Sequence, residues 1–285
     1  MKNQIYIFII ACIWGSGFLL MKKAEVVFHP ITIATSRVLI ACLTLLIICV
    51  IKKRFWIPKK EEFIKLWFVI IFGFCFPFFI QPYLISDYGS GFIGMMLAFL
   101  PLFTLFFSYL LLEGSINKYQ IIGIIGGLCF SFLLFIDRLD KDVITIGGIL
   151  LALTVPLSYT LSNIYIKKYY KSVDPLPFTM TCSALAAIVL LPLNLLYFEI
   201  KSEEHLNEAI FSLLILGVFM SAIALYWFYN IVMIEGPLIA SVTSYIIPII
   251  ALTWGWLDNE LLTTNQVFGI TGILLMIRVI SIKPK

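Results

Sequence analysis

Charge is scarce in this 285-residue sequence. Charged residues make up 13% of the chain, about half the share found in an average soluble protein, while hydrophobic residues make up 61% and the mean hydropathy is +1.05. So few charges cannot cover a surface that faces water. The net charge of +4 comes from basic residues gathered between apolar stretches. They form no stripe that could bind nucleic acid, so no nucleic-acid partner is expected.

The side chains of common catalytic and metal sites are also scarce. The chain has only two histidines, His29 and His205, and its six cysteines all fall inside apolar segments without a CxxC spacing. No glycine-rich nucleotide-binding loop is present. We therefore expect no metal, no cofactor and no enzymatic activity. An intramembrane enzyme acting on lipid is the remote alternative, but the apolar segments hold no pair of aspartates and no Ser/His pair.

Long apolar runs are abundant instead. A membrane-spanning helix needs roughly 20 mostly apolar residues, and isolated strands cannot satisfy their backbone hydrogen bonds in lipid. We therefore predict an all-α polytopic membrane protein. Lys22 and Lys23 follow the first run with no small-residue cleavage site, so we interpret that run as a retained span. The ten predicted spans are 3–21, 31–51, 63–85, 91–112, 118–136, 145–166, 176–198, 209–231, 238–257 and 264–281.

The basic residues predict the orientation of these spans. Fourteen Lys and Arg residues fall on the side of the N-terminus and five on the other side. Positive residues favour the cytoplasmic side, so both termini are expected in the cytoplasm. The loops are too short to form a soluble domain. We expect a protein that is integral to the plasma membrane, specifically the inner membrane of a bacterium. Membrane lipid is therefore an expected partner.

The chain also contains an internal repeat. Pro101 and Glu113 recur as Pro248 and Glu260 at an offset of 147 residues. Five spans fall in each half, and five is odd, so the second half must enter the membrane upside down. The prediction is a pair of inverted five-helix repeats, residues 3–137 and 145–282. Further matches are Lys22-Lys23 with Lys167-Lys168, Pro30 with Pro175, Gly123 with Gly269 and Gly126 with Gly272.

With these features the chain resembles the EamA family of the drug/metabolite transporter superfamily. The resemblance covers about residues 3–282 and rests on Trp14-Gly15-Ser16-Gly17 followed by Lys22-Lys23, Pro30 with Arg37, the Pro/Glu pairs and the glycine pairs. It implies a ten-helix fold with a central cavity between the halves. It also implies transport, often export, of an amino acid, a related metabolite or a drug. A metabolite importer or exchanger of the same fold is the alternative. A monomer and a homodimer both remain open.

Arg37 is the charged residue that lies deepest in a predicted span, about 12 Å along the helix from His29. A charge at that depth usually faces a cavity or a partner, and no span holds a deep acid to pair with it. It either binds an anionic group of a solute, or extends its charged end outward to the membrane interface, or fixes packing by donating to helix carbonyls. The other residues predicted to line a substrate cavity are Trp14, Gln81, Tyr159, Asn163 and Tyr245. The alternative role of the Tyr and Trp residues near span ends is to anchor those ends at the membrane interface.

The repeated prolines and glutamates have two interpretations each. Pro101 and Pro248 are expected to kink their helices, either as part of gating or as fixed packing features. Glu113 and Glu260 are interpreted as structural caps for the start of the next helix, with a gate or proton site as the alternative.

Overall fold

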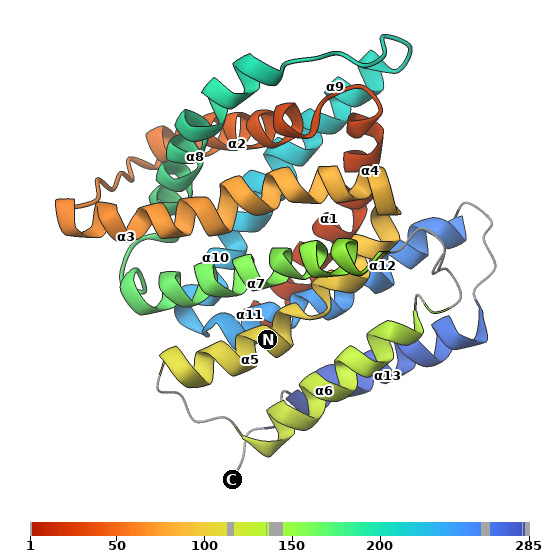
Figure 1. Cartoon of the computed structure of the whole chain (residues 1–285). Coiled ribbons are helices and arrows are strands. Elements are labelled where there is room, and N and C mark those ends of the chain that lie inside the picture. The colour runs from red at the N-terminus through yellow and green to blue at the C-terminus, as the bar shows by residue number, and fades with distance from the viewer. Residues whose placement is uncertain are drawn as a thin grey trace.

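The computed structural model describes residues 2–112, 117–134, 136, 145–257, 263–280 and 282. These residues are helical apart from short connections, and their one extended pairing is a single antiparallel bridge between Phe28 and Ile200. The elements, shown in Figure 1, are α1 (Lys2–Glu25), α2 (Pro30–Lys52), α3 (Lys60–Ile70), the π-helical η1 (Ile71–Cys75), α4 (Phe76–Leu97), α5 (Leu100–Leu111), α6 (Lys118–Leu133), α7 (Ile146–Tyr169), α8 (Pro175–Tyr197), α9 (Leu206–Ile215), the π-helical η2 (Leu216–Ala224), α10 (Leu225–Ile234), α11 (Pro237–Ser241), α12 (Thr243–Leu257) and α13 (Thr264–Ile280).

Seven helical stretches of the described chain are long and apolar enough to cross a membrane. Three further apolar helices are shorter: Lys118–Leu133, Pro237–Ile250 and Thr264–Ile280. The described helices confirm the prediction of an all-helical membrane protein. The arrangement of ten spans in two inverted repeats stays a prediction. The seven are Gln4–Glu25, Pro30–Lys52, Lys60–Gly89, Phe92–Leu111, Ile146–Tyr169, Pro175–Tyr197 and Leu206–Ile234.

Helix α2 shows how the sequence divides interior from exterior. Ala34, Val38 and Leu45 are fully buried along one face, whereas Leu43 and Ile47 are each 60% exposed on another. Helical periodicity places each set on a single stripe. Because the exposed stripe is apolar, its natural surroundings are lipid chains.

Helices α2 and α8 pack side by side and run antiparallel (Figure 1). Near the start of α2, the Thr32 hydroxyl donates to the Asn194 amide oxygen at 2.7 Å. Just beyond its end, Arg54 forms an ion pair with Asp174 at 3.5 Å. These contacts link the start of each helix to the end of the other.

Helix α6 packs against α13 at one edge of the bundle (Figure 1). Two glycines allow the close approach. A Cβ on Gly123 would lie 2.9 Å from the Met276 carbonyl oxygen, and a Cβ on Gly269 would lie 2.9 Å from the Phe130 carbonyl oxygen. Small residues let helix backbones approach closely in membranes. The two contacts are equivalent, because in each one a glycine in the first half of one helix meets a backbone carbonyl near the end of the other helix.

The starts of α6 and α13 carry matching caps. The Asn117 side chain accepts from the Gln120 N–H, and the Gln120 side chain accepts from the Asn117 N–H. Thr263 and Gln266 make the same reciprocal pair at the start of α13. Such pairs satisfy N–H groups that a helix start leaves free. The predicted caps Glu113 and Glu260 lie outside the described residues, so their role stays a prediction.

Several breaks interrupt the helical segments. Helix α4 turns sharply at Gly89, whose φ of 79° favours glycine. Helix α4 ends at Leu97 and α5 begins at Leu100, so Pro101 occupies the first turn of a new helix. Pro248 instead lies inside α12, where it provides no N–H for the Ser244 carbonyl four residues earlier.

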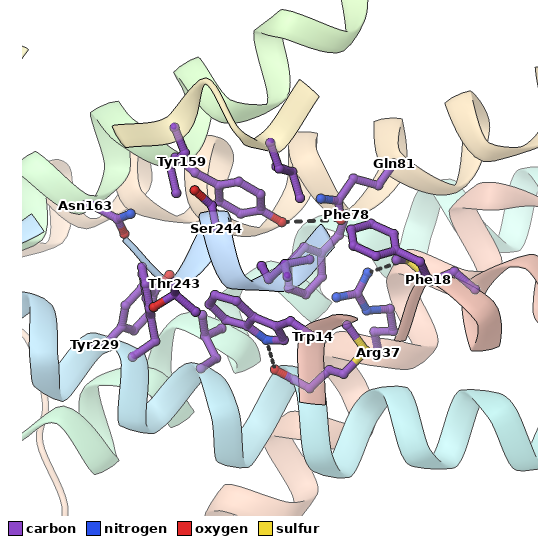
Figure 2. Close-up of a pocket in the computed structure, with 17 residues that line it drawn as sticks. Trp14, Phe18, Arg37, Phe78, Gln81, Tyr159, Asn163, Tyr229, Thr243 and Ser244 are labelled. Atoms are coloured by element: carbon purple, nitrogen blue, oxygen red, sulfur yellow. Dashed lines mark hydrogen bonds between the residues drawn. The ribbon is translucent and has the colours of Figure 1, made fainter. Parts of the chain in front are cut away.

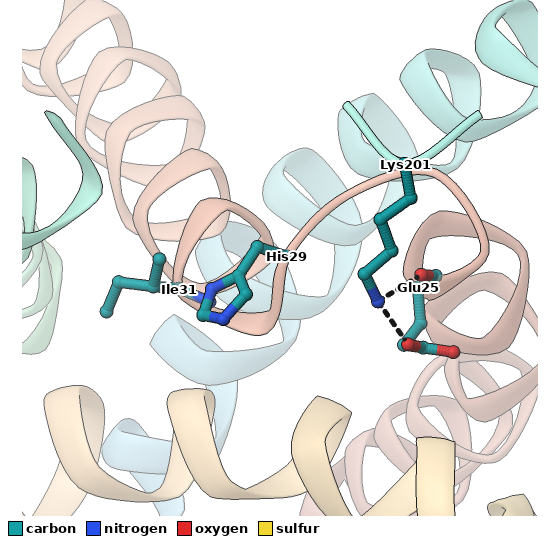
Figure 3. Close-up of polar contacts among 4 residues, drawn as sticks. All are labelled: Glu25, His29, Ile31 and Lys201. Carbon is teal, nitrogen blue, oxygen red and sulfur yellow. Dashed lines mark hydrogen bonds and ion pairs between the residues drawn. The ribbon is translucent and has the colours of Figure 1, made fainter. Parts of the chain in front are cut away.

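Polar contacts between connecting segments fall at two opposite ends of the bundle. At one end, which Figure 3 shows, Lys201 Nζ lies 2.6 Å from a Glu25 carboxylate oxygen and donates to the Glu25 backbone carbonyl. His29 accepts from the Ile31 N–H there and caps α2. At the other end, the Arg54–Asp174 ion pair closes the α2–α8 contact.

Candidate functional site

A cavity lies at the centre of the bundle. About 70 Å³ of it is open to the centres of water-sized molecules, which is room for several waters. Its walls come from α1, α2, α4, α5, α7, η2, α10 and α12, while α6 and α13 provide no lining residue. The lining residues, drawn in Figure 2, are Trp14, Phe18, Met21, Arg37, Phe78, Gln81, Leu97, Leu100, Tyr159, Asn163, Met220, Leu225, Phe228, Tyr229, Thr243, Ser244 and Ile247.

Arg37 is the one charged side chain in this lining, and it is only 3% exposed. Its Nε donates to the Ser221 hydroxyl at 3.1 Å, and its Nη1 donates to the Met21 sulfur at 3.4 Å. The centre of its guanidinium lies 4.0 Å from the centroid of the Phe78 ring. No carboxylate contacts it within the described part of the chain. Its charge is therefore held by a hydroxyl, a thioether and an aromatic face, which compensate it only weakly.

Aromatic side chains form the middle of the cavity. The Trp14 indole donates to the Met220 carbonyl at 3.2 Å and packs against Phe228 with ring centroids 4.9 Å apart. The Tyr159 hydroxyl donates to the Gln81 amide oxygen at 3.5 Å, a long hydrogen bond. In Figure 2 the Trp14 and Tyr159 rings lie between the Arg37 end and the Asn163 end. These contacts fix the orientation of the walls and leave the rings free to pack on an organic solute.

The far end of the cavity is polar but uncharged. Thr243 and Ser244 donate to the carbonyls of Ala240 and Ser241, so their hydrogens are used within their own helical segments. Asn163 is 3% exposed, and its amide makes no hydrogen bond to any residue that the structure describes. A buried amide normally has a partner, so Asn163 has donors and an acceptor available for a bound molecule.

The structure brings most of the predicted cavity residues together. Trp14, Arg37, Gln81, Tyr159 and Asn163 all line the one cavity, although binding by any of them stays a prediction. Tyr245 does not line it.

Tyr245 instead packs α12 against α6. Its hydroxyl donates to the Ile124 carbonyl at 2.6 Å, and its ring lies where a Cβ of Gly127 would be.

Several lining residues carried no strong signal in the sequence. Tyr229 lies near the end of its helix, where a tyrosine usually anchors the membrane interface, yet it is only 2% exposed and borders the cavity. Phe78 lies in a run of phenylalanines, which the sequence alone would suggest faces lipid. Their position along a helix could be read from the sequence, but the face that they occupy could not.

The described lining residues combine aromatic and polar side chains and show no catalytic arrangement. Among the described residues it contains no Asp, Glu, His or Cys, and no group of three such residues that could hold a metal occurs elsewhere in them. A helical bundle with lipid-facing apolar stripes and a central, partly polar cavity defines a class of protein: a polytopic membrane protein with an internal cavity.

Sequence comparison identifies the family within this class. The model of the EamA-like transporter family matches residues 1–136 and 146–282, which together cover nearly the whole chain. The chain therefore belongs to the EamA-like transporter family, and the resemblance predicted from its motifs is confirmed. It is an integral membrane protein of a transporter family.

Relatives from several organisms span nearly the full chain. An "Uncharacterized transporter YoaV" of Bacillus subtilis is 26% identical over 94% of this chain and 92% of its own length. An "Uncharacterized transporter" of Archaeoglobus fulgidus is 26% identical over 97% of both chains. One protein of known crystal structure superposes with a TM-score of 0.80 at 14% identity, over 99% of this chain and 98% of that one. At that identity the likeness shows the fold alone.

Proposed function

We propose that the protein is a secondary transporter that exports a small organic solute, such as an amino acid, a related metabolite or a drug, by alternating access. The central cavity carries this proposal, because its walls combine aromatic rings with buried polar groups that have no partner among the described residues. Such a mixture is typical of sites that bind small organic molecules. Import or exchange by the same fold is the alternative.

The inverted repeat is the second part of the proposal. Residues at equivalent positions of the two halves line the cavity together, as expected if it lies on a pseudo-two-fold axis. The glycine contacts between α6 and α13 support the same axis, because exchanging the halves at an offset of 146 turns the Gly123–Met276 contact into the Gly269–Phe130 contact. The equivalent lining pairs are Trp14 with Tyr159, Phe18 with Asn163, Leu97 with Ser244 and Leu100 with Ile247.

The proposed orientation places both termini in a bacterial cytoplasm. The end of the bundle with the Arg54–Asp174 ion pair carries the larger share of basic residues, so we assign it to the cytoplasmic side. The end with the Glu25–Lys201 pair is then the outer side.

Pro101 and Pro248 are the proposed hinge elements. Each follows a break in its span, and the carbonyl that Pro248 leaves without its helical partner belongs to the cavity residue Ser244.

A cavity-filling variant tests transport. Asn163→Phe places a ring inside the cavity, while Asn207→Phe places the same ring on the exposed surface of α9 as a matched control. Metabolites are measured inside and outside cells that express the wild type or either variant. We expect at least one solute to move outward with the wild type and with Asn207→Phe, and to stay inside with Asn163→Phe. Identical metabolite distributions for all three proteins and for the empty host would reject the proposal.

A further inference from the structure

The charge balance of the cavity narrows the class of solute. Arg37 contributes one positive charge, and no other charged side chain lines the walls in the described residues. Its Nη2 makes no hydrogen bond to a described residue. A buried cation without an ionic partner is costly, and an anion that paired with it would offset that cost. A cavity with this lining is therefore suited to bind one negative charge.

The unused hydrogen-bonding groups agree with an anion. Gln81 accepts from Tyr159 at its oxygen, which leaves its Nε2–H₂ group without a partner among the described residues. In Figure 2 Gln81 and Arg37 lie at the same end of the cavity. That end thus offers several N–H donors and no acidic acceptor. Carboxylate oxygens accept from such donors, and a guanidinium can bind both oxygens at once.

The same geometry disfavours an α-amino acid. The ammonium of an amino acid is attached to the carbon next to its carboxylate, so it would lie within a few ångströms of the Arg37 guanidinium. Like charges at that distance repel in a medium of low dielectric constant. The described lining offers no carboxylate that could neutralise the ammonium. A phosphate monoester fits less well, because it carries close to two negative charges at neutral pH and the lining supplies one positive charge.

The opposite end of the cavity selects for a second, uncharged polar group. Asn163 presents a free amide there, and the Thr243 and Ser244 oxygens can still accept. Between the two ends lie the rings of Trp14 and Tyr159 (Figure 2). An elongated solute with an aromatic middle would contact all three regions.

We propose that the carried solute is an organic monocarboxylate with an apolar or aromatic body and a neutral hydrogen-bonding group at its far end, and that zwitterionic amino acids are discriminated against. This assignment rests on the proposed transport function and removes amino acids from the solutes named there. The carboxylate pairs with Arg37, the body packs between Trp14 and Tyr159, and the far group bonds to Asn163. The site therefore selects solutes by their charge as well as by their shape.

A matched ligand series tests the assignment on purified wild-type protein. The probes are 3-(4-hydroxyphenyl)propionate, its neutral amide, tyrosine and tyramine, which share one ring and differ in their charged groups; phenyl phosphate provides the dianionic arm. Calorimetry gives the Kd of each. We expect the propionate to bind about tenfold or more tightly than every other probe, because a charge-assisted pair is worth about 10- to 100-fold in affinity. Equal or tighter binding of tyrosine, tyramine or phenyl phosphate, or no binding of the propionate, overturns the assignment.

Variants show whether Arg37 and Asn163 carry the selectivity. In Arg37→Gln the preference for the propionate over its amide should fall to within about threefold, whereas Arg54→Gln, which removes an exposed arginine outside the cavity, should keep it. Asn163→Leu should abolish the preference for the 4-hydroxy probe over 3-phenylpropionate and leave the propionate-to-amide ratio unchanged. An unchanged ratio in Arg37→Gln overturns the role of Arg37. If Arg37→Gln does not fold, the ligand series on the wild type and the Asn163→Leu variant still test the monocarboxylate assignment.

Transport assays separate this assignment from the proposed function. Proteoliposomes that move a neutral or zwitterionic solute as well as the propionate would overturn the anion assignment and leave the transport function standing. Proteoliposomes that bind the propionate but move no solute would reject the transport function and leave the site assignment standing.

Discussion

The contact between α6 and α13 gives a prediction with a built-in comparison. A Cβ on Gly123 would lie 2.9 Å from the Met276 carbonyl oxygen, 3.0 Å from the Ile280 backbone nitrogen and 2.4 Å from the Ile280 Cγ1 atom. Backbone atoms cannot rotate away, so Gly123→Ala must push the two helices apart. Overpacking of this kind costs about 1–3 kcal/mol. Alanine favours the helix over glycine by about 1 kcal/mol, which offsets part of this cost, so we expect a net loss of up to about 2 kcal/mol.

Gly126→Ala is the matched control on the same helix. Its new Cβ would meet only the Met276 side chain, with the sulfur at 2.4 Å, and that flexible chain can turn aside. Because alanine favours the helix here too, we expect Gly126→Ala to leave the stability unchanged or to raise it by up to about 1 kcal/mol.

The assay heats detergent-solubilised protein and measures the folded fraction by size-exclusion chromatography. Gly123→Ala should lower the midpoint by several degrees, because each kcal/mol corresponds to about 2–4 °C in a protein of comparable size. Gly269→Ala, which meets the Phe130 carbonyl oxygen at 2.9 Å, should lower it by a similar amount. Ligand selectivity should not change, because neither helix lines the cavity. Equal midpoints for Gly123→Ala and Gly126→Ala would refute the reasoning.

Two further predictions concern the cavity and the orientation. A Cβ on Gly17 would occupy the place of the Met220 side chain, which lines the cavity, so Gly17→Ala should lower the transport rate at least severalfold with little change in thermal stability. Gly147→Ala is the control, because its Cβ would meet only the Thr145 hydroxyl oxygen at 4.0 Å. An equal rate for both variants contradicts the prediction. A reporter that works only in the cytoplasm should be active when fused after Lys285, and activity only of a periplasm-specific reporter there would reverse the orientation.

The positions of the helices could be predicted from the sequence, because long apolar runs have few alternatives in lipid. The face that each residue occupies could not be predicted in the same way. Ser244 and Tyr245 are neighbours on α12, and successive residues on a helix point about 100° apart. Ser244 therefore borders the cavity while Tyr245 contacts α6. The packing partner decides this, and the low charge of the chain leaves no amphipathic stripe that would reveal it.

Helix interruptions were equally difficult to predict. Pro101 suggests a kink within one helix, yet α4 ends before it and α5 begins at Leu100. The π-helical segments η1 and η2 contain no proline. No residue pattern in them indicates that their helical turns hold one residue more than an α-helical turn. Their position depends on how the side chains of neighbouring helices interlock, so tertiary contacts determine it.

The two halves differ at several positions that face the cavity. The α6–α13 contact tolerates no side chain at Gly123 or Gly269, so both halves retain glycine there. Positions that border open space carry no such restriction. Phe18 and Asn163 are equivalent residues, yet one is apolar and the other is polar. A scaffold with matching halves can thus enclose a cavity with unlike ends.

Arg37 has the buried Cys182 as its equivalent, so the cation occurs at one end of the cavity alone. Arg37 lies seven residues after the start of α2, near the end with the Glu25–Lys201 pair, and Asn163 lies six residues before the end of α7, near the opposite end. On the proposed assignment, a solute that enters from the Arg54–Asp174 end must lead with its carboxylate to reach Arg37. The unlike ends therefore fix one direction for the bound molecule, which a cavity with two equal ends could not do.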